Sequence, residues 1–472
     1  MPSPIQSHRS DQVVAIIGGG LSGAVLARNL ARLRRADELR IVVIEPRDAL
    51  GQGLAYSTPD PDHRLNVPEH KMSLISDQPL HFQDWLASGR APWIAPVSTT
   101  ATGDVFVPRQ VFGRYIAEHL QEQIDAGRIT HLRGRAVAAQ RHAGGFRIRL
   151  DNGALVEAQR VVLAATHPAP ALPGALAPLR GTPALIADPY APDALAAIPA
   201  EGDVLIVGSG LTGADIVASL HRRGHRGRIH LLSRHGRRSQ PHGPQQAETT
   251  ADFSVAPERT ALALLRRIRR ALAQDLAAGL TWHPLFDRLR VQGPQIWAAL
   301  PQVERRRLLR HLRGLWDIHR FRIAPQTHEV LGRLIRSGQV RPITGNVTRT
   351  DPGQVVMLNI AQRQGDALSL RVTHVVLATG PAHGAVIAQN PVLADLARQG
   401  LIGPDPLALG IWTTPDGQAI AQDGQAQDDL LVAGPLARGA VGELMGAPEV
   451  TIWAETTALR LSRDLARPAS AA

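Results

Sequence analysis

The chain has 472 residues, of which 44% are hydrophobic and 20% are charged, as is typical of two or three globular domains. It has no cysteine, which excludes disulfide-reductase chemistry, thiolate catalysis, and iron–sulfur or Cys-type zinc sites, and we expect no metal. The net charge of +11 with only 4% aromatic residues indicates phosphate-bearing or acidic small molecules rather than nucleic acid.

The first eleven residues are polar and contain no apolar run before a cleavage site, so they do not resemble a secretory signal. No stretch of the chain approaches the 18 or so consecutive apolar residues of a membrane-spanning helix. We therefore expect a cytoplasmic protein without membrane contact. The sequence leaves its oligomeric state open.

A first nucleotide-binding unit is predicted near the N-terminus. The β-branched run 13–17 predicts a buried parallel strand, and a glycine-rich turn follows at 18–23. Apolar residues spaced three and four apart then predict a helix over 25–33, and a second strand is expected at 40–44. This order of strand, turn, helix and strand is typical of a dinucleotide-binding fold.

Four residues of this unit have the chemistry that a dinucleotide needs. Gly18 permits the tight turn, Gly20 lets a pyrophosphate approach the backbone, and Gly23 brings helix and strand together. Glu45 follows the second strand, where a carboxylate can accept hydrogen bonds from the adenosine ribose. The four together predict an adenine dinucleotide at the N-terminus.

Three further stretches precede the second half of the chain. The long polar segment 51–79 is expected to lie across the ring system of the cofactor, with Asn66 among its polar contacts. Alternating residues between 134 and 150 predict an added antiparallel meander. The strand-like run 161–166 and the proline-rich stretch 167–173 predict a crossover into a second domain.

A second unit repeats the pattern of the first. An apolar strand at 204–207 enters a glycine turn at 208–213, and a helix over 214–222 leads to a strand at 228–232. Two such units in one chain predict a flavoprotein that accepts hydride from a nicotinamide. FAD is expected in the first unit, because the later segments can then return and complete the flavin site.

The second turn consists of Gly208, Gly210 and Gly213, with the same roles as in the first unit. In place of the carboxylate, Ser233 and Arg234 follow its second strand. An arginine there suits a 2′-phosphate, so NADPH is favoured over NADH, although NADH stays an alternative.

The fold class predicted is α/β, with two Rossmann-like dinucleotide-binding domains and a helical insertion. We expect the first part of the FAD domain at 10–185 and its returning part at 341–466. The NAD(P) domain is expected at 200–340, with leucine- and arginine-rich helices inserted at 257–337.

Contacts from the returning part are expected at two places. The run 374–381 matches the first crossover and includes Thr379 and Gly380, which we expect to contact cofactor. Gly434 lies where a Gly-Asp pair usually contacts the ribityl chain of FAD, but here the next residue is Pro435.

The segments 51–79, 208–213, 316–325 and 434–439 resemble the bacterial FAD/NAD(P)-binding family that contains FAD-dependent urate hydroxylase and aspartate N-monooxygenase. The similarity extends over nearly the whole chain. It implies monooxygenation: the nicotinamide reduces FAD, reduced flavin binds dioxygen as a C4a-hydroperoxide, and one oxygen atom passes to the substrate.

The resemblance favours urate as the substrate and 5-hydroxyisourate as the product. A small anionic substrate would need bidentate donors, for which Arg320 and Arg322 are candidates, with His319 as a possible proton carrier or a structural histidine at a helix end. One alternative is N-hydroxylation of a small amino acid such as aspartate. The other is a flavin electron-transfer reductase with a protein partner.

Overall fold

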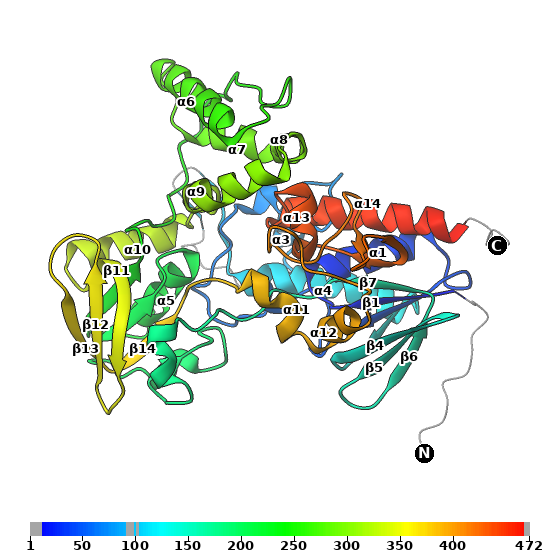
Figure 1. The fold of residues 1–472 in the computed structure, drawn as a ribbon, viewed down its shortest axis with the longest axis horizontal. Coiled ribbons are helices and arrows are strands. Elements are labelled where there is room, and N and C mark those ends of the chain that lie inside the picture. Colours follow the sequence, from blue (N-terminus) through cyan, green and yellow to red (C-terminus); the bar gives the residue numbers. More distant parts are fainter. Residues whose placement is uncertain (1–11, 91–98, 101–102, 467–472) are drawn as a thin grey trace.

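Two separate β-sheets organise the chain, and a lobe of helices stands over them (Figure 1). The computed structural model describes residues 12–90, 99–100 and 103–466. The N-terminal eleven residues, where we predicted no secretory signal, lie outside the described residues. No helix in the described ranges is both long and apolar enough to cross a bilayer.

The first sheet has the strand order β15-β16-β7-β1-β2-β3, and its pairs are parallel except for β15 with β16. Its strands are β1 (Val13–Ile17), β2 (Arg40–Ile44), β3 (Ile129–Leu132), β7 (Arg160–Leu163), β15 (Gln418–Ile420) and β16 (Ala426–Val432). Both predicted strands of the first unit are confirmed. Apart from Arg40 at the start of β2 they are apolar, because both faces of a parallel sheet are covered.

Successive residues of β1 enter two different cores. Val14 and Ile16 pack with α1 (Leu21–Leu33), α4 (Arg109–Asp125) and α14 (Ala447–Ala466). Ala15 and Ile17 face the opposite layer, which consists of a three-stranded antiparallel sheet and α12. Its elements are β4 (Ala136–His142), β5 (Gly145–Leu150), β6 (Leu155–Ala158) and α12 (Pro391–Arg398), so the predicted meander is confirmed.

The second sheet has the order β13-β12-β11-β10-β9-β14-β8. The long strand β11 pairs parallel with β10 through its first half and antiparallel with β12 through its second half. The strands are β8 (Leu185–Ile186), β9 (Val204–Val207), β10 (Ile229–Ser233), β11 (Val340–Asp351), β12 (Val356–Gln362), β13 (Leu368–Val372) and β14 (His374–Leu377).

The two crossings between the sheets fall where the strand-like runs ended. The first lies between β7 and β8, and the second lies between β14 and β15. The residues from 341 to 377 therefore belong to the second sheet and not to the returning part of the FAD domain, which is a correction to the predicted boundary. The reason is that β11 extends the parallel sheet by an antiparallel hairpin. The alternation of polar and apolar residues along a strand does not indicate which of two sheets the strand joins.

The helical insertion is confirmed, but its last helix has another role. The first four helices form a lobe with its own apolar core around Phe253, Leu285 and Ile296. The fifth helix, α10, packs against α5 (Leu211–Arg222) and covers the second sheet. The five are α6 (Ala261–Ala277), α7 (His283–Val291), α8 (Gly293–Ala299), α9 (Gln302–Arg320) and α10 (Pro325–Arg336).

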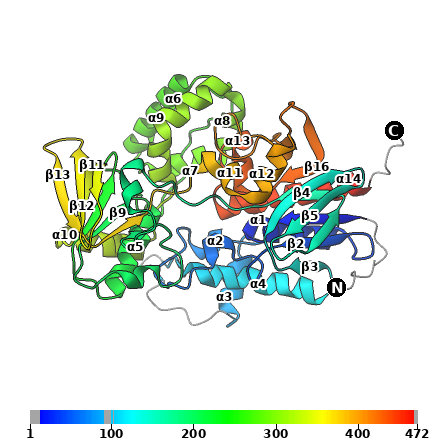
Figure 2. The same cartoon turned by 60° about the horizontal axis from the view of Figure 1, so that its bottom comes forward.

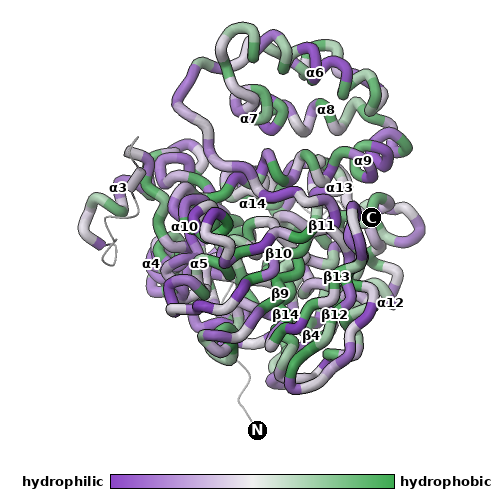
Figure 3. The backbone as a smooth tube through the Cα atoms, turned by 90° about the vertical axis from the view of Figure 1, so that its left-hand side faces the viewer, coloured by the Kyte–Doolittle hydropathy of each residue, from purple (hydrophilic) through white to green (hydrophobic). Residues whose placement is uncertain are grey.

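The lobe lies above the junction between the two sheets (Figure 2), and hydrophilic and hydrophobic residues alternate along α6 (Figure 3). The chain also has short elements in its connections. They are the helices α2 (Gly53–Tyr56), α3 (His81–Ala87), α11 (Val386–Gln389) and α13 (Arg438–Val441), and the 3-10 turns Glu69–Lys71, Gly174–Leu179, Ala194–Ala197, His383–Ala385 and Pro435–Ala437.

A buried ion pair joins the two nucleotide domains. Arg109 at the start of α4 places Nη2 2.5 Å from Oδ2 of Asp215 in α5, and the Tyr190 hydroxyl lies 3.3 Å from the same oxygen. Burial raises the pKa of Asp215 to about 6, and the Arg109 charge opposes that rise, so the carboxylate is ionised at neutral pH. The pair fixes α5 against the FAD domain.

Removing one partner of this pair is expected to cost more than removing both. Asp215→Ala leaves a guanidinium buried without its counter-charge and is expected to lower the free energy of unfolding by about 3 kcal/mol. The double variant Arg109→Met/Asp215→Leu is expected to be close to wild type. Thermal and urea unfolding measure the stability of both variants. Glu201→Ala, which removes one partner of an exposed ion pair, is the control. Equal losses for single and double variants would contradict the assignment.

Candidate functional site

The outer glycines of the first turn are required by close packing, and the middle glycine is not. A Cβ at Gly18, whose φ is +106°, would lie 2.4 Å from the Ala164 carbonyl oxygen, and one at Gly23 would lie 2.0 Å from that of Gly18. At Gly20 the nearest atom to such a Cβ is the Gly53 Cα at 3.4 Å, which is an ordinary contact. The missing side chain at Gly20 therefore leaves room for a ligand rather than for the protein.

Glu45 is only 5% exposed and bonds the turn itself. Its Oε2 accepts a hydrogen bond from the Gly19 backbone N–H at 2.9 Å, and its Oε1 accepts from the Arg47 Nη1 at 3.0 Å. The carboxylate thus holds the turn in shape at the place where the sequence predicted a ribose contact. Each carboxylate oxygen has two lone pairs, so a ribose hydroxyl could also be accepted.

Gly434 comes back to this turn from the C-terminal part of the chain. Its φ is +87°, and a Cβ there would lie 2.1 Å from Oγ of Ser22, at the start of α1. Gly434 thus lies beside the first turn, and its contact with the ribityl chain stays a prediction. The following Pro435 has no backbone N–H, so this residue offers no donor to the cofactor.

The second turn repeats the geometry of the first. A Cβ at Gly208 would lie 2.1 Å from the Ala378 carbonyl oxygen, and one at Gly213 would lie 2.3 Å from that of Gly208. A Cβ at Gly210 would have no atom of the described residues within 4 Å. Two turns far apart in sequence thus keep open the one position where a pyrophosphate approaches the backbone.

A cavity of about 770 Å³ lies in front of the second turn. Its wall includes residues 208–212 together with the predicted cofactor contacts Ser233, Arg234, Thr379 and Gly380. The structure therefore brings Thr379 and Gly380 to the second turn and not to the first. The volume is in the range of small-molecule and cofactor sites.

One end of this cavity is strongly basic. Arg234, His235 and Arg237 line it, and Nη1 of Arg363 lies 2.8 Å from Nδ1 of His235. The pKa of His235 is lowered by desolvation and by the charges of these three arginines. Within the described residues, neither Arg234 nor Arg237 forms an ion pair through its side chain. These guanidinium groups are available to an anionic ligand.

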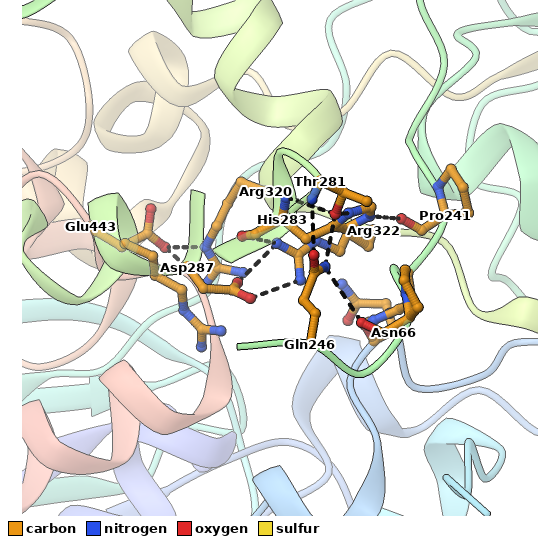
Figure 4. Close-up of polar contacts among 12 residues, drawn as sticks. Asn66, Pro241, Gln246, Thr281, His283, Asp287, Arg320, Arg322 and Glu443 are labelled. Carbon is orange, nitrogen blue, oxygen red and sulfur yellow. Dashed lines mark hydrogen bonds and ion pairs between the residues drawn. The ribbon is translucent and has the colours of Figure 1, made fainter. Parts of the chain in front are cut away.

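The two arginines predicted to bind substrate already have carboxylate partners (Figure 4). Arg320 is 7% exposed, and its Nη2 lies 3.0 Å from Glu443 Oε1 and 3.4 Å from Glu449 Oε2. Arg322 donates to Asp287 at 2.8 Å. Both therefore bind other parts of the protein, Arg320 tying α9 to the C-terminal segment. The sequence could not indicate this, because Glu443 is 123 residues from Arg320.

Two further predicted site residues, His319 and Asn66, form contacts within the protein. Nδ1 of His319 lies 2.7 Å from the Leu315 carbonyl oxygen, and its ring stacks on Phe286 with centroids 4.6 Å apart, as expected of a structural histidine. The Asn66 carbonyl oxygen lies 3.0 Å from Nε2 of His242 (Figure 4). Neither residue lines the cavity in front of the second turn, and the predicted contact of Asn66 with the flavin stays a prediction.

The sequence missed the contacts that fix the two domains against each other. The ion pair of Arg109 with Asp215 is one, and His63 is another: its ring nitrogens lie 2.6 Å from Thr58 Oγ1 and 3.1 Å from Ser219 Oγ. Both link residues more than 100 positions apart. No periodic pattern marks such pairs, so only the folded chain reveals them.

Two family models match parts of the chain. Residues 15–168 match a model described as FAD-NAD(P)-binding, and residues 99–251 match L-lysine 6-monooxygenase/L-ornithine 5-monooxygenase. No curated protein sequence matches. The fold is that of FAD- and NADP-binding monooxygenases. The prediction of FAD together with a nicotinamide cofactor is confirmed, and so is the α/β fold class.

Three solved structures illustrate the shared fold. The reduced ornithine hydroxylase of Pseudomonas aeruginosa has 16% identity and a TM-score of 0.62, over 97% of this chain and 100% of that one. The L-lysine 6-monooxygenase of Pseudomonas syringae has 17% identity and a TM-score of 0.61, over 97% and 100%. The FAD-bound cadaverine monooxygenase of Erwinia amylovora has 15% identity and a TM-score of 0.63, over 96% of this chain and 94% of that one. Neither family model describes a urate hydroxylase or an aspartate N-monooxygenase.

The two middle glycines provide a matched pair of tests. Both have extended backbones that alanine also adopts, with φ of −69° at Gly20 and −80° at Gly210. Gly20→Ala is expected to fold but to retain less FAD after purification. Gly210→Ala is expected to keep its FAD and to raise the KM for the nicotinamide cofactor about tenfold, or ~1.4 kcal/mol.

Gly23→Ala and Gly213→Ala serve as controls, because their Cβ atoms would meet backbone oxygens. Both are expected to lower the melting temperature, unlike the changes at Gly20 and Gly210. Flavin absorbance per chain, steady-state kinetics and thermal unfolding measure the three effects. Loss of FAD from Gly210→Ala would contradict the division of cofactors between the two turns.

Proposed function

We propose that this chain is an FAD-dependent, NADPH-consuming monooxygenase that hydroxylates the nitrogen of a small aliphatic amine or amino acid. The match of residues 99–251 to L-lysine 6-monooxygenase/L-ornithine 5-monooxygenase carries this proposal. That segment includes the first crossover and the whole second turn, the parts that we expect to bring the two cofactors together. The fold shared with ornithine and lysine hydroxylases supports it.

The basic end of the cavity supports NADPH as the hydride donor. A 2′-phosphate carries about two negative charges, and Arg234 and Arg237 line the cavity without carboxylate partners among the described residues. The ornithine N-hydroxylase of Kutzneria sp. 744, with 14% identity and a TM-score of 0.63, was solved with NADP⁺ and reduced FAD. The same cofactor pair suits the two turns here.

Bound FAD supplies the activation of dioxygen, and the residues of this chain supply its surroundings. Helix α9 closes one side of the nicotinamide cavity with Asp317 and Ile318, and Phe321 follows directly after it. Ile318 and Phe321 make this part of the wall apolar, which favours the exclusion of water there. Only a neutral amine can act as a nucleophile, and the arginine-rich surroundings disfavour a second positive charge on a bound ammonium group.

Of the substrates considered from the sequence, an amino acid is better supported than urate. The hypothesis of urate hydroxylation required Arg320 and Arg322 to be free to bind the substrate. Both are paired with carboxylates of the protein. The similarity is to enzymes named for amine substrates. An electron-transfer role has no comparable support.

A substrate panel tests the proposal directly. Holoenzyme with NADPH is expected to consume oxygen faster with ornithine, lysine, cadaverine or aspartate, and to form a product one oxygen atom heavier that reacts as a hydroxylamine. NADPH oxidation, oxygen uptake and product mass are measured together. Hydroxylation of urate alone would contradict N-hydroxylation, as would rapid reduction of artificial acceptors without any oxygenated product.

The choice of nicotinamide cofactor has its own test. Arg234→Ala and Arg237→Ala are each expected to raise the KM for NADPH by about tenfold or more while changing the KM for NADH little, because a charge-assisted hydrogen bond to phosphate is lost. Arg238→Ala is the control, since this neighbour does not line the cavity. Equal effects on both cofactors would mean that these arginines do not contact a 2′-phosphate.

A further inference from the structure

A buried guanidinium without a partner lies at the junction of the two domains. Arg438, the first residue of α13, is 8% exposed. Its Nε is fully buried and has no hydrogen-bond partner, and its guanidinium forms no ion pair with any described residue. Leaving a charged group buried and uncompensated is costly. Such a group is expected to gain a partner when the protein is at work.

The carboxylates nearest to this guanidinium are engaged elsewhere. Asp317 pairs with Arg313 on α9, and Glu443 pairs with Arg320. Asp405 accepts hydrogen bonds from two backbone N–H groups of its own loop. Burial raises the pKa of Asp317 and that of Asp405 above the ordinary value. These carboxylates influence the charge from a distance but do not bind it.

Two histidines with unpartnered nitrogens complete the cluster. His167 lies on the first crossover and His383 on the second, and their rings meet edge to face with centroids 4.6 Å apart. Both ring nitrogens of His167 and Nδ1 of His383 are buried without a partner. Burial and the Arg438 charge lower the pKa of His167 to about 4 and that of His383 to about 3. Both rings are neutral at pH 7, with one N–H each to donate.

The cluster lies beside the nicotinamide cavity, although its three side chains are not part of the cavity wall. Ala382, the neighbour of His383, lines that cavity together with Asp317. The Ala382 N–H also lies 3.4 Å from the Ala169 carbonyl oxygen, which joins the two crossovers. A ligand that extends beyond the part of the wall formed by Ala382 and Asp317 would reach these three side chains.

The kind of ligand follows from the donor groups of the cluster and from the anions that already have a binding place elsewhere. One planar cation and two neutral N–H donors suit an oxyanion, and arginine binds carboxylates in bidentate fashion. The phosphates of the two dinucleotides have their own turns at Gly18–Gly23 and at Gly208–Gly213. The anionic group that remains in the proposed reaction is a carboxylate of the substrate.

We propose that Arg438, with His167 and His383, binds the carboxylate of an amino-acid substrate at the junction of the two crossovers. The inference rests on the proposed function and adds a specificity to it: the enzyme prefers an amino acid to the diamine that lacks the carboxylate. Arg438 supplies the charge and the bidentate geometry. The two histidines donate without adding a charge that would bring a second anion.

Matched substrate pairs test the specificity. Wild-type holoenzyme is expected to favour ornithine over putrescine and lysine over cadaverine in kcat/KM. Arg438→Gln is expected to lower kcat/KM for the preferred amino acid about 100-fold and to leave that for its diamine nearly unchanged, since only the carboxylate loses its partner. Arg438→Lys, which keeps the charge without the bidentate fork, is expected to fall between the two. Arg310→Gln, exposed on α9, is the control.

A binding measurement separates this inference from the proposed function. Oxidised holoenzyme is titrated with ornithine, ornithine methyl ester and putrescine, and the change in the visible flavin spectrum is recorded. Tighter binding of the free acid, lost in Arg438→Gln with FAD content unchanged, supports the carboxylate site even if no product forms. The ester comparison uses wild-type protein and holds if the variant does not fold.

Three outcomes overturn the inference. One is equal affinity of wild-type protein for the acid, its ester and the diamine. Another is an equal loss of kcat/KM for both members of a pair in Arg438→Gln. The third is loss of FAD from that variant, which would mean that the guanidinium binds the flavin and not the substrate.

Discussion

Close approach of backbone to backbone at two glycine turns is the constraint on which the structure depends. At Gly18 and Gly208 the turn touches the carbonyl oxygen at the end of the neighbouring strand, and at Gly23 and Gly213 the helix touches the turn. No side chain fits at these four positions. The contacts direct the N-termini of α1 and α5 toward the space where phosphates are bound, with their N–H groups free.

The two turns are useful together only if the domains that carry them keep one orientation. The Arg109–Asp215 pair joins α4 to α5, and the His63–Ser219 contact joins the loop after α2 to α5. From the other side, Arg320 ties the helical insertion to the C-terminal segment. Arg320 and Arg322 thus act as structural ties, although the sequence made them candidates for substrate binding.

Pairing separates the structural arginines from those that face ligands. Arg320 and Arg322 have carboxylates within hydrogen-bond distance, whereas Arg234, Arg237 and Arg438 have none among the described residues. Arg234 and Arg237 lie in the cavity wall and Arg438 is buried beside it, and an unpaired guanidinium keeps its full attraction for an anion. The charge of a paired guanidinium is already largely compensated by its carboxylate. The net charge of +11 therefore matters at a few positions and not as a whole.

The sequence by itself determined the two nucleotide-binding units, their order, the meander and the presence of the insertion. These features depend on local spacing, such as Gly18 to Gly23 and the strand that ends before Glu45. The tertiary structure decided the partners of Arg320, the sheet that receives residues 341–377, and the meeting of His167 with His383. These depend on contacts between residues tens to hundreds of positions apart, which no local pattern encodes because burial and charge pairing are set only when the chain is folded.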